Sequence, residues 1–168
     1  MNVASLMLVA FAMSMPTVMA QDTDFSGTWT LDAEASQFPE PPGAGGGRGG
    51  RLGSGGLGRG PATMVIEQSD DVLTMERQLA GGTQVASYRL DGVESTNAGP
   101  RGQQVTTSRW EDGDLVTEGT LAIATPRGSR SIQLRERWTR SEDGQELVIE
   151  STFVTPRGEM VARLVYRR

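Results

Sequence analysis

The sequence predicts an all-β protein, an up-and-down antiparallel β-barrel of about 8–10 strands, and three observations lead to this prediction. After Pro61, short segments rich in β-branched residues follow one another, and turn residues separate them every 10 to 15 residues. Apolar and polar side chains alternate along most of these segments, as they do in a strand with one buried face. No helical periodicity competes with this alternation.

Ten strands are predicted, and a long Gly/Arg-rich loop separates the first two. The loop follows from the composition of residues 39–61, which are almost entirely Gly, Pro and Arg and cannot build a core. An apolar segment with Phe25, Trp29 and Leu31 precedes it, so the tract lies inside the domain. The predicted strands are 27–31, 63–68, 72–79, 83–90, 93–98, 103–111, 114–124, 129–140, 145–154 and 159–167.

The first residues, 1–20, have the features of a signal peptide. They carry no charged side chain, and residues 6–13 form an apolar run of the length expected for its hydrophobic core. Val18 and Ala20 precede Gln21 at the positions that signal peptidase requires. We therefore predict cleavage near Ala20, a periplasmic or secreted location, and one domain over residues 21–168. A buried N-terminal strand or helix is the alternative.

The composition excludes several classes of function. The chain has no cysteine and no histidine, so the common zinc and haem ligands and the Ser-His-Asp triad are absent. We predict no metal, no cofactor and no catalytic residue. The net charge of −5 argues against nucleic acid as a partner, because a phosphate backbone selects for basic surfaces. The polar face of the strands also argues against a membrane-spanning barrel.

The turns are of two chemical kinds that alternate along the chain. Acidic turns occur at 69–71, 91–92, 112–113 and 143–144, where the Asp-Gly pairs suit tight type I′ hairpins. The other turns begin with Ala80-Gly81-Gly82 and continue as three Pro-Arg-Gly turns. Alternate turns of a meander lie at the same end, which predicts an acidic rim and an arginine rim. Turn preference, solubility or internal duplication would also explain the pattern. The three turn arginines are Arg101, Arg127 and Arg157.

The alternation assigns an interior face to most strands, and two charges fall on it. Arg77 lies between Met75 and Leu79, and Glu136 lies between Leu134 and Trp138. Buried charges need partners, so these two pair with each other or with other polar groups, or one of them anchors a ligand. A bulge or a position near the rim would instead let them reach water. Small residues share this face, so space should remain in the middle. The phase of 103–111 is ambiguous. The apolar interior residues are Leu73, Met75, Leu79, Ala86, Tyr88, Leu90, Leu115, Leu121, Ile123, Ile132, Leu134, Trp138, Leu147, Ile149, Phe153, Met160, Ala162, Leu164 and Tyr166.

The segment Phe25-Ser26-Gly27-Thr28-Trp29 resembles the start of lipocalins and related calycin barrels. In that superfamily a Gly-x-Trp motif, here Gly27 and Trp29, closes the base of the barrel. The strand number and the insertion after the first strand resemble the fatty-acid-binding-protein branch, and the chain also resembles exported bacterial lipocalin-like proteins, a name that implies a shape and not an activity. The resemblance implies that a C-terminal basic residue, Arg163 or Arg167, packs over the tryptophan. The lipocalin Thr-Asp-Tyr motif and disulfides are missing, and a Gly/Arg tract stands where fatty-acid-binding proteins have two helices.

These features lead to three hypotheses about function. The first is an exported protein that binds a small hydrophobic or amphiphilic ligand in the lumen, with its head group at the arginine rim or on Arg77; the arginines favour an anionic amphiphile or lipid. The second is a protein-interaction or cell-envelope structural module with a filled lumen and no small ligand. The third, an enzyme with Glu136 and Arg77 as an acid–base pair, is disfavoured because no nucleophile or histidine base accompanies them. The predicted ligand-binding residues are Arg77, Glu136, Arg101, Arg127, Arg157, Trp138 and Tyr88.

Overall fold

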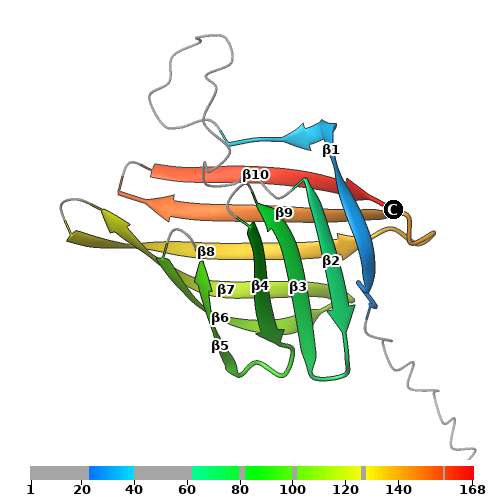
Figure 1. The fold of residues 1–168 in the computed structure, drawn as a ribbon, viewed down its shortest axis with the longest axis horizontal. Coiled ribbons are helices and arrows are strands. Elements are labelled where there is room, and N and C mark those ends of the chain that lie inside the picture. The colour runs from blue at the N-terminus through cyan, green and yellow to red at the C-terminus, as the bar shows by residue number, and fades with distance from the viewer. Residues whose placement is uncertain (1–22, 40–61, 80–81, 100–101, 126–127, 157) are drawn as a thin grey trace, which may run out of the picture.

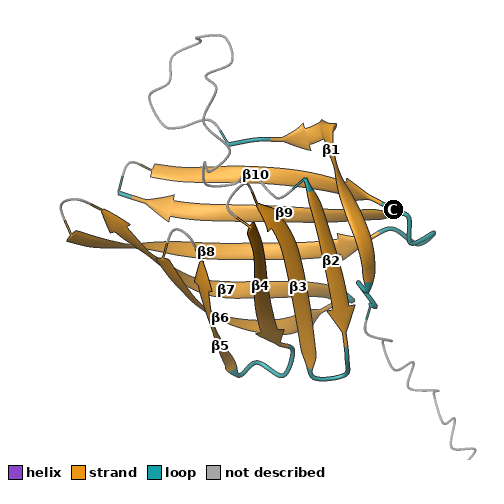
Figure 2. Cartoon of the chain, in the orientation of Figure 1, coloured by secondary structure: helices purple, strands orange, loops and turns teal. Residues whose placement is uncertain are grey.

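All ten predicted strands are present in the computed structural model, which describes residues 23–39, 62–79, 82–99, 102–125, 128–156 and 158–168. Every regular element in these ranges is a strand, as Figure 2 shows. Within them no helix is long and apolar enough to cross a membrane. The strands are β1 (Gly27–Gln37), β2 (Thr63–Gln68), β3 (Val72–Leu79), β4 (Gly82–Arg89), β5 (Glu94–Gly99), β6 (Gly102–Glu111), β7 (Asp114–Thr125), β8 (Gly128–Arg140), β9 (Glu146–Thr155) and β10 (Gly158–Arg167).

The strands form one antiparallel sheet that curls into a nearly closed barrel. The order is β4-β3-β2-β1-β10-β9-β8-β7-β6-β5, so each strand pairs with its neighbours in the chain, except that β4 and β5 form the two edges, and β1 pairs with β10. In Figure 1 the strands β2 to β4 run across β6 to β10 at a large angle, which makes two layers that face each other. The antiparallel barrel predicted from the alternation is therefore confirmed.

The barrel closes between β4 and β5 through side chains. The Asn97 amide accepts a hydrogen bond from the Ser87 backbone nitrogen at 2.8 Å and donates one to the Ser87 carbonyl oxygen at 2.9 Å. The Ser95 hydroxyl accepts one from the Arg89 backbone nitrogen at 2.8 Å. Because these β5 side chains occupy backbone groups at the edge of β4, they take the place of a ladder at the seam.

The first strand is longer than predicted. It continues to Gln37, whereas the sequence placed its end at Leu31. Its first half pairs with β2 and its second half with β10, and the register with β10 shifts between Asp32 and Gln37. The Asp32 carboxylate accepts hydrogen bonds from two backbone nitrogens in this bulge, those of Glu34 and Ala35. Local side-chain bonding of this kind is not visible in apolar alternation. The remaining residues of the Gly/Arg tract, 40–61, lie outside the described residues.

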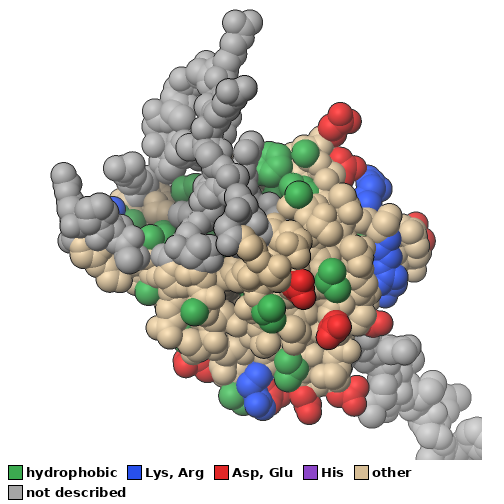
Figure 3. All heavy atoms as spheres, in the orientation of Figure 1, with side chains coloured by type: hydrophobic (Ala, Val, Ile, Leu, Met, Phe, Trp, Pro, Cys, Tyr) green, Lys and Arg blue, Asp and Glu red, His purple; other side chains and the backbone are tan. Residues whose placement is uncertain are grey.

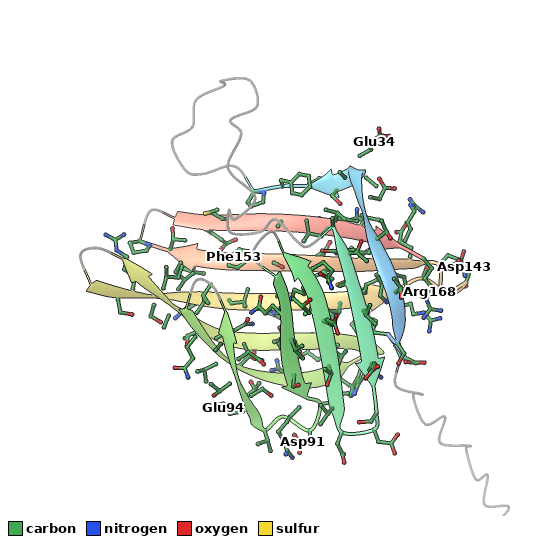
Figure 4. The ribbon with its side chains drawn as sticks, viewed as in Figure 1. Glu34, Asp91, Glu94, Asp143, Phe153 and Arg168 are labelled. Atoms are coloured by element: carbon green, nitrogen blue, oxygen red, sulfur yellow. The ribbon has the colours of Figure 1, made fainter. Side chains whose placement is uncertain are left out.

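The acidic turns differ from one another more than predicted. Asp112 and Gly113 form the expected two-residue turn, with positive φ angles of 55° and 88°. The other two Asp-Gly pairs lie in longer loops, because β4 ends at Arg89 and β8 ends at Arg140. Acidic side chains gather along the lower edge in Figure 3, where the β2–β3 and β4–β5 connections lie in Figure 1. Because the two layers cross, Asp91 and Asp143 are well separated in Figure 4.

The interior contains two separate apolar clusters. The larger one surrounds Phe25 and Trp29, and the smaller one consists of Ile132, Leu134 and Phe153. Most of the predicted interior side chains are buried, but Leu121, Ile123 and Met160 are only partly so, and the side chain of Leu79 lies outside the described residues. Two buried residues, Val116 and Val165, belong to the opposite face of their strands and were not predicted. In β6 the face with Thr106 and Ser108 is the buried one.

Candidate functional site

The layer formed by β6 to β10 presents three rows of side chains to the interior, and the members of each row are paired across neighbouring strands. The first row is apolar, the second is polar and the third is again mostly apolar, with Gly119 contributing no side chain. The polar row therefore separates the two apolar clusters, which we call the base cluster (around Phe25 and Trp29) and the mouth cluster (Ile132, Leu134 and Phe153). The rows are Trp110, Leu115, Trp138, Ile149 and Leu164; Ser108, Thr117, Glu136, Ser151 and Ala162; and Thr106, Gly119, Leu134, Phe153 and Met160.

Hydroxyl groups form the hydrogen bonds within the polar row. Ser108 and Thr117 share a hydrogen bond of 2.8 Å, and both side chains are buried. The Ser151 hydroxyl donates to the Glu136 Oε1 atom at 3.0 Å. Thr106, in the neighbouring row, is 1% exposed, and its hydroxyl has no hydrogen-bond partner among the described residues. Buried hydroxyls without partners are unfavourable and are uncommon in proteins.

Arg77 approaches this interior from the other layer. Its Nη2 atom donates a hydrogen bond of 3.1 Å to the hydroxyl of Tyr88, which is a neutral partner. Its Nε atom is buried and has no hydrogen-bond partner within the described ranges. None of the ion pairs formed by the described residues includes Arg77. The guanidinium is therefore satisfied only in part by the protein.

Tyr88 and Trp138 connect Arg77 to Glu136. The two rings meet edge to face, with centroids 6.1 Å apart. The Trp138 Nε1 atom then lies 3.4 Å from the Glu136 Oε2 atom, to which it donates a long hydrogen bond. The predicted pairing of Arg77 with Glu136 does not occur, because two aromatic side chains stand between them. Each charge instead contacts neutral polar groups, as the sequence allowed.

The pKa values of two buried tyrosines, Tyr88 and Tyr166, are affected by the charges of this region. Burial raises the pKa of the Tyr88 hydroxyl, Arg77 lowers it through its charge and its hydrogen bond, and the charge of Glu136 raises it further. Burial likewise raises the pKa of Tyr166, with opposing contributions from Arg77 and Glu136. Both charges thus act on the same two hydroxyls, and both tyrosines stay neutral at ordinary pH.

The base cluster is closed by aromatic stacking. Phe25 stacks on Trp110 with centroids 5.8 Å apart and meets Trp138 edge to face at 6.1 Å. Trp29 is fully buried, and its Nε1 atom donates to the Phe25 carbonyl oxygen at 2.9 Å. Trp29 therefore lies inside the base cluster, and its role as the residue that closes the barrel stays a prediction.

The basic residue over Trp29 is Arg168, not Arg163 or Arg167. The Arg168 guanidinium carbon lies 4.8 Å from the Trp29 ring centroid. A Cβ atom at Gly27 would lie 2.7 Å from an Arg168 guanidinium nitrogen, so the glycine leaves room for this contact. The other two arginines form ion pairs elsewhere, Arg163 with Glu150 and Arg167 with Asp32 and Glu146.

The predicted site residues thus separate into two groups. Arg77, Tyr88, Trp138 and Glu136 come together in the interior. Arg101, Arg127 and Arg157 lie outside the described residues, so the arginine rim stays a prediction. Sequence reasoning missed the unpartnered hydroxyl of Thr106, because the phase of its strand was ambiguous. The signal that would have assigned it is Ser108, which pairs with the interior residue Thr117.

Comparison with known proteins identifies one similar architecture. No family model and no curated protein matches the sequence. Among solved structures, zebrafish ileal bile acid-binding protein in complex with cholic acid is similar, with a TM-score of 0.46 and 19% sequence identity, over 63% of this chain and 71% of that chain. The function proposed below rests on the interior of this chain alone. In that interior a polar row and a partly satisfied arginine lie between two apolar clusters, within the ten-stranded meander that the resemblance implied.

Proposed function

We propose that the protein binds a small anionic amphiphile, with the acidic head group on Arg77. The observation that carries the proposal is the incomplete set of partners around this guanidinium: among the described residues its Nε atom is buried without a hydrogen-bond partner, and its Nη2 atom donates to the neutral Tyr88 hydroxyl. An interior cation without a counter-charge is unfavourable. A carboxylate or phosphate oxygen is the complementary partner, because a guanidinium binds it by charge-assisted and often bidentate hydrogen bonds.

The apolar part of the ligand lies among the residues of the mouth cluster. The base cluster is closed by stacked aromatic rings, and its large side chains, such as Trp29 and Leu115, are fully buried by one another. The mouth cluster is smaller and is extended by two partly buried residues, Ile123 and Met160. Apolar side chains that are incompletely covered gain most from an added apolar surface.

The turns at the mouth would attract the same ligand. The mouth residues Ile123 and Met160 stand only a few positions from two Pro-Arg-Gly turns in the sequence. Arginines near an opening raise the local concentration of anions. Export after cleavage near Ala20 belongs to this proposal and is supported by the sequence features of residues 1–20.

Titration with dodecanoate, followed by calorimetry, tests the proposal. The wild-type protein should show saturable binding to one site. Arg77→Met should weaken it about 10-fold or more, because the methionine keeps much of the apolar stem and removes the charge-assisted bonds. Arg135→Met is the matched control, since Arg135 lies on the outer face and 55% of its side chain is exposed.

Two results would contradict the proposal. The first is the absence of saturable binding by the folded wild-type protein, which would favour a filled barrel that serves as an interaction or envelope module. The second is equal affinity of Arg77→Met and wild type, which would remove Arg77 from the site. Circular dichroism of each variant establishes that the sheet is intact.

A further inference from the structure

Glu136 is a second interior charge that the proposed function does not use. It lies in the middle of the polar row, between Thr117 of β7 and Ser151 of β9. Its carboxylate accepts hydrogen bonds from two neutral donors, the Ser151 hydroxyl and the Trp138 indole. None of the ion pairs of the described residues includes it. An ionised carboxylate has about four acceptor sites, so capacity remains for further donors.

The two interior charges face a common region without neutralising each other. Arg77 comes from β3 and Glu136 from β8, and the chain of contacts between them passes through Tyr88 and Trp138. Both charges act on the hydroxyls of Tyr88 and Tyr166. A molecule in this region therefore meets a cation on one side and an anion on the other.

We infer that the ligand has a bipolar head group, with an acidic oxygen on Arg77 and a hydroxyl or ammonium donor on Glu136. This inference rests on the proposed function and narrows its ligand class. A plain fatty carboxylate would satisfy Arg77 but would place its anion near a second anion, which is unfavourable. A donor a few bonds from the acidic group meets both charges at once. The buried Thr106 hydroxyl, which has no protein partner, adds a further polar contact for such a head group.

Four probes of the same chain length test the inference in the full chain. Dodecanoate is compared with 2-hydroxydodecanoate, 3-hydroxydodecanoate and 2-aminododecanoate, which share its chain length and add one donor. We expect at least one of the three to bind about 10-fold more tightly than dodecanoate, which corresponds to one hydrogen bond to a charged group. Glu136→Gln should reduce this preference to about 2-fold or less, and it should strengthen dodecanoate binding because a nearby anion is removed.

The control and the outcomes separate this inference from the proposed function. Glu150→Gln makes the same chemical change on the exposed face of β9 and should preserve both affinities. Failure of all four probes to bind would overturn the proposed function itself. Binding of dodecanoate with no gain from any donor would overturn only the inference. Equal weakening of every probe by Glu136→Gln would also overturn it, because that result indicates a structural role.

Discussion

The two apolar clusters of this barrel differ in how completely they are packed. At the base, Phe25, Trp29 and Leu147 are 0% exposed, and Phe25 stacks on Trp110. At the mouth, Ile132, Leu134 and Phe153 are 6–7% exposed, a level that at the base only Leu90, Ile149 and Leu164 approach, and partly buried residues extend both clusters. The base is also anchored by residues from both ends of the described chain, Phe25 and Arg168.

The difference indicates that the base contributes more to folding stability and that the mouth is the better candidate for contact with a ligand. Closely packed side chains that bury all their apolar surface contribute to the free energy of folding. Side chains that stay partly uncovered contribute less to folding and can be covered further by a ligand. The polar row between the clusters, with Glu136 at its centre, is where the head group of the proposed ligand would lie. Four substitutions test how sharp this division is.

Trp29→Ala should have the largest effect on stability. The substitution leaves a cavity in the fully buried base and removes the contact with Arg168, so the free energy of unfolding should fall by about 4 kcal/mol. Chemical denaturation followed by circular dichroism measures the change. A loss below about 1 kcal/mol would show that the base is not the stabilising region and would break the comparison.

Leu115→Ala and Leu134→Ala are a matched pair on neighbouring strands. Leu115 lies in the base row and Leu134 in the mouth row. We expect the free energy of unfolding to fall by about 4 kcal/mol for Leu115→Ala and by about 2 kcal/mol for Leu134→Ala, because the side chain removed at the mouth is less completely buried. Only Leu134→Ala should weaken dodecanoate binding, and calorimetry on both variants checks this. The reverse assignment of the binding defect would place the ligand in the base.

Tyr88→Phe should have the smallest effect at neutral pH and a distinct effect at alkaline pH. Loss of the hydrogen bond from Arg77 should lower the free energy of unfolding by about 1 kcal/mol. Burial raises the Tyr88 pKa above its usual value of 10.0, so the unfolded chain ionises first. Wild-type stability is therefore retained below pH 10.0 and lost as the pH rises toward the folded-state pKa.

The variant should lose less stability than wild type between about pH 10 and pH 11.5, because it lacks one of the two buried tyrosine hydroxyls. Denaturation curves across this range compare the two slopes. Parallel slopes would show that Tyr88 is not shielded from solvent at the boundary between the clusters.

The fold was predictable from sequence to a large extent because its rules are local. The alternation of Leu73 and Met75 with polar neighbours assigned the interior face of β3, and the Asp112-Gly113 pair predicted a tight turn that the structure contains. The extension of β1 to Gln37 was not predictable, because a bulge held by Asp32 has no signature in apolar alternation.

The candidate site was predictable only as a set of separate residues. Arg77 and Glu136 stood out because each is a charge on an apolar face, but the sequence left their partners open. Their partners are Tyr88 for Arg77, and Ser151 and Trp138 for Glu136. The packing of Arg168 against the Trp29 ring was missed for the same reason, since three arginines near the C-terminus have similar local surroundings in the sequence.

The sequence by itself determined the strand number, the antiparallel meander and the inward face of most strands, because side-chain alternation and turn residues act over a few positions. Only the tertiary structure decided that the interior has two apolar clusters with a polar row between them. The polar members of that row come from four strands, β6 to β9, and they become neighbours only through the register of the ladders. The curl of the sheet then decided that Arg77 of β3 is linked to Glu136 of this row through Tyr88 and Trp138, since contacts across a barrel depend on how the whole sheet curls.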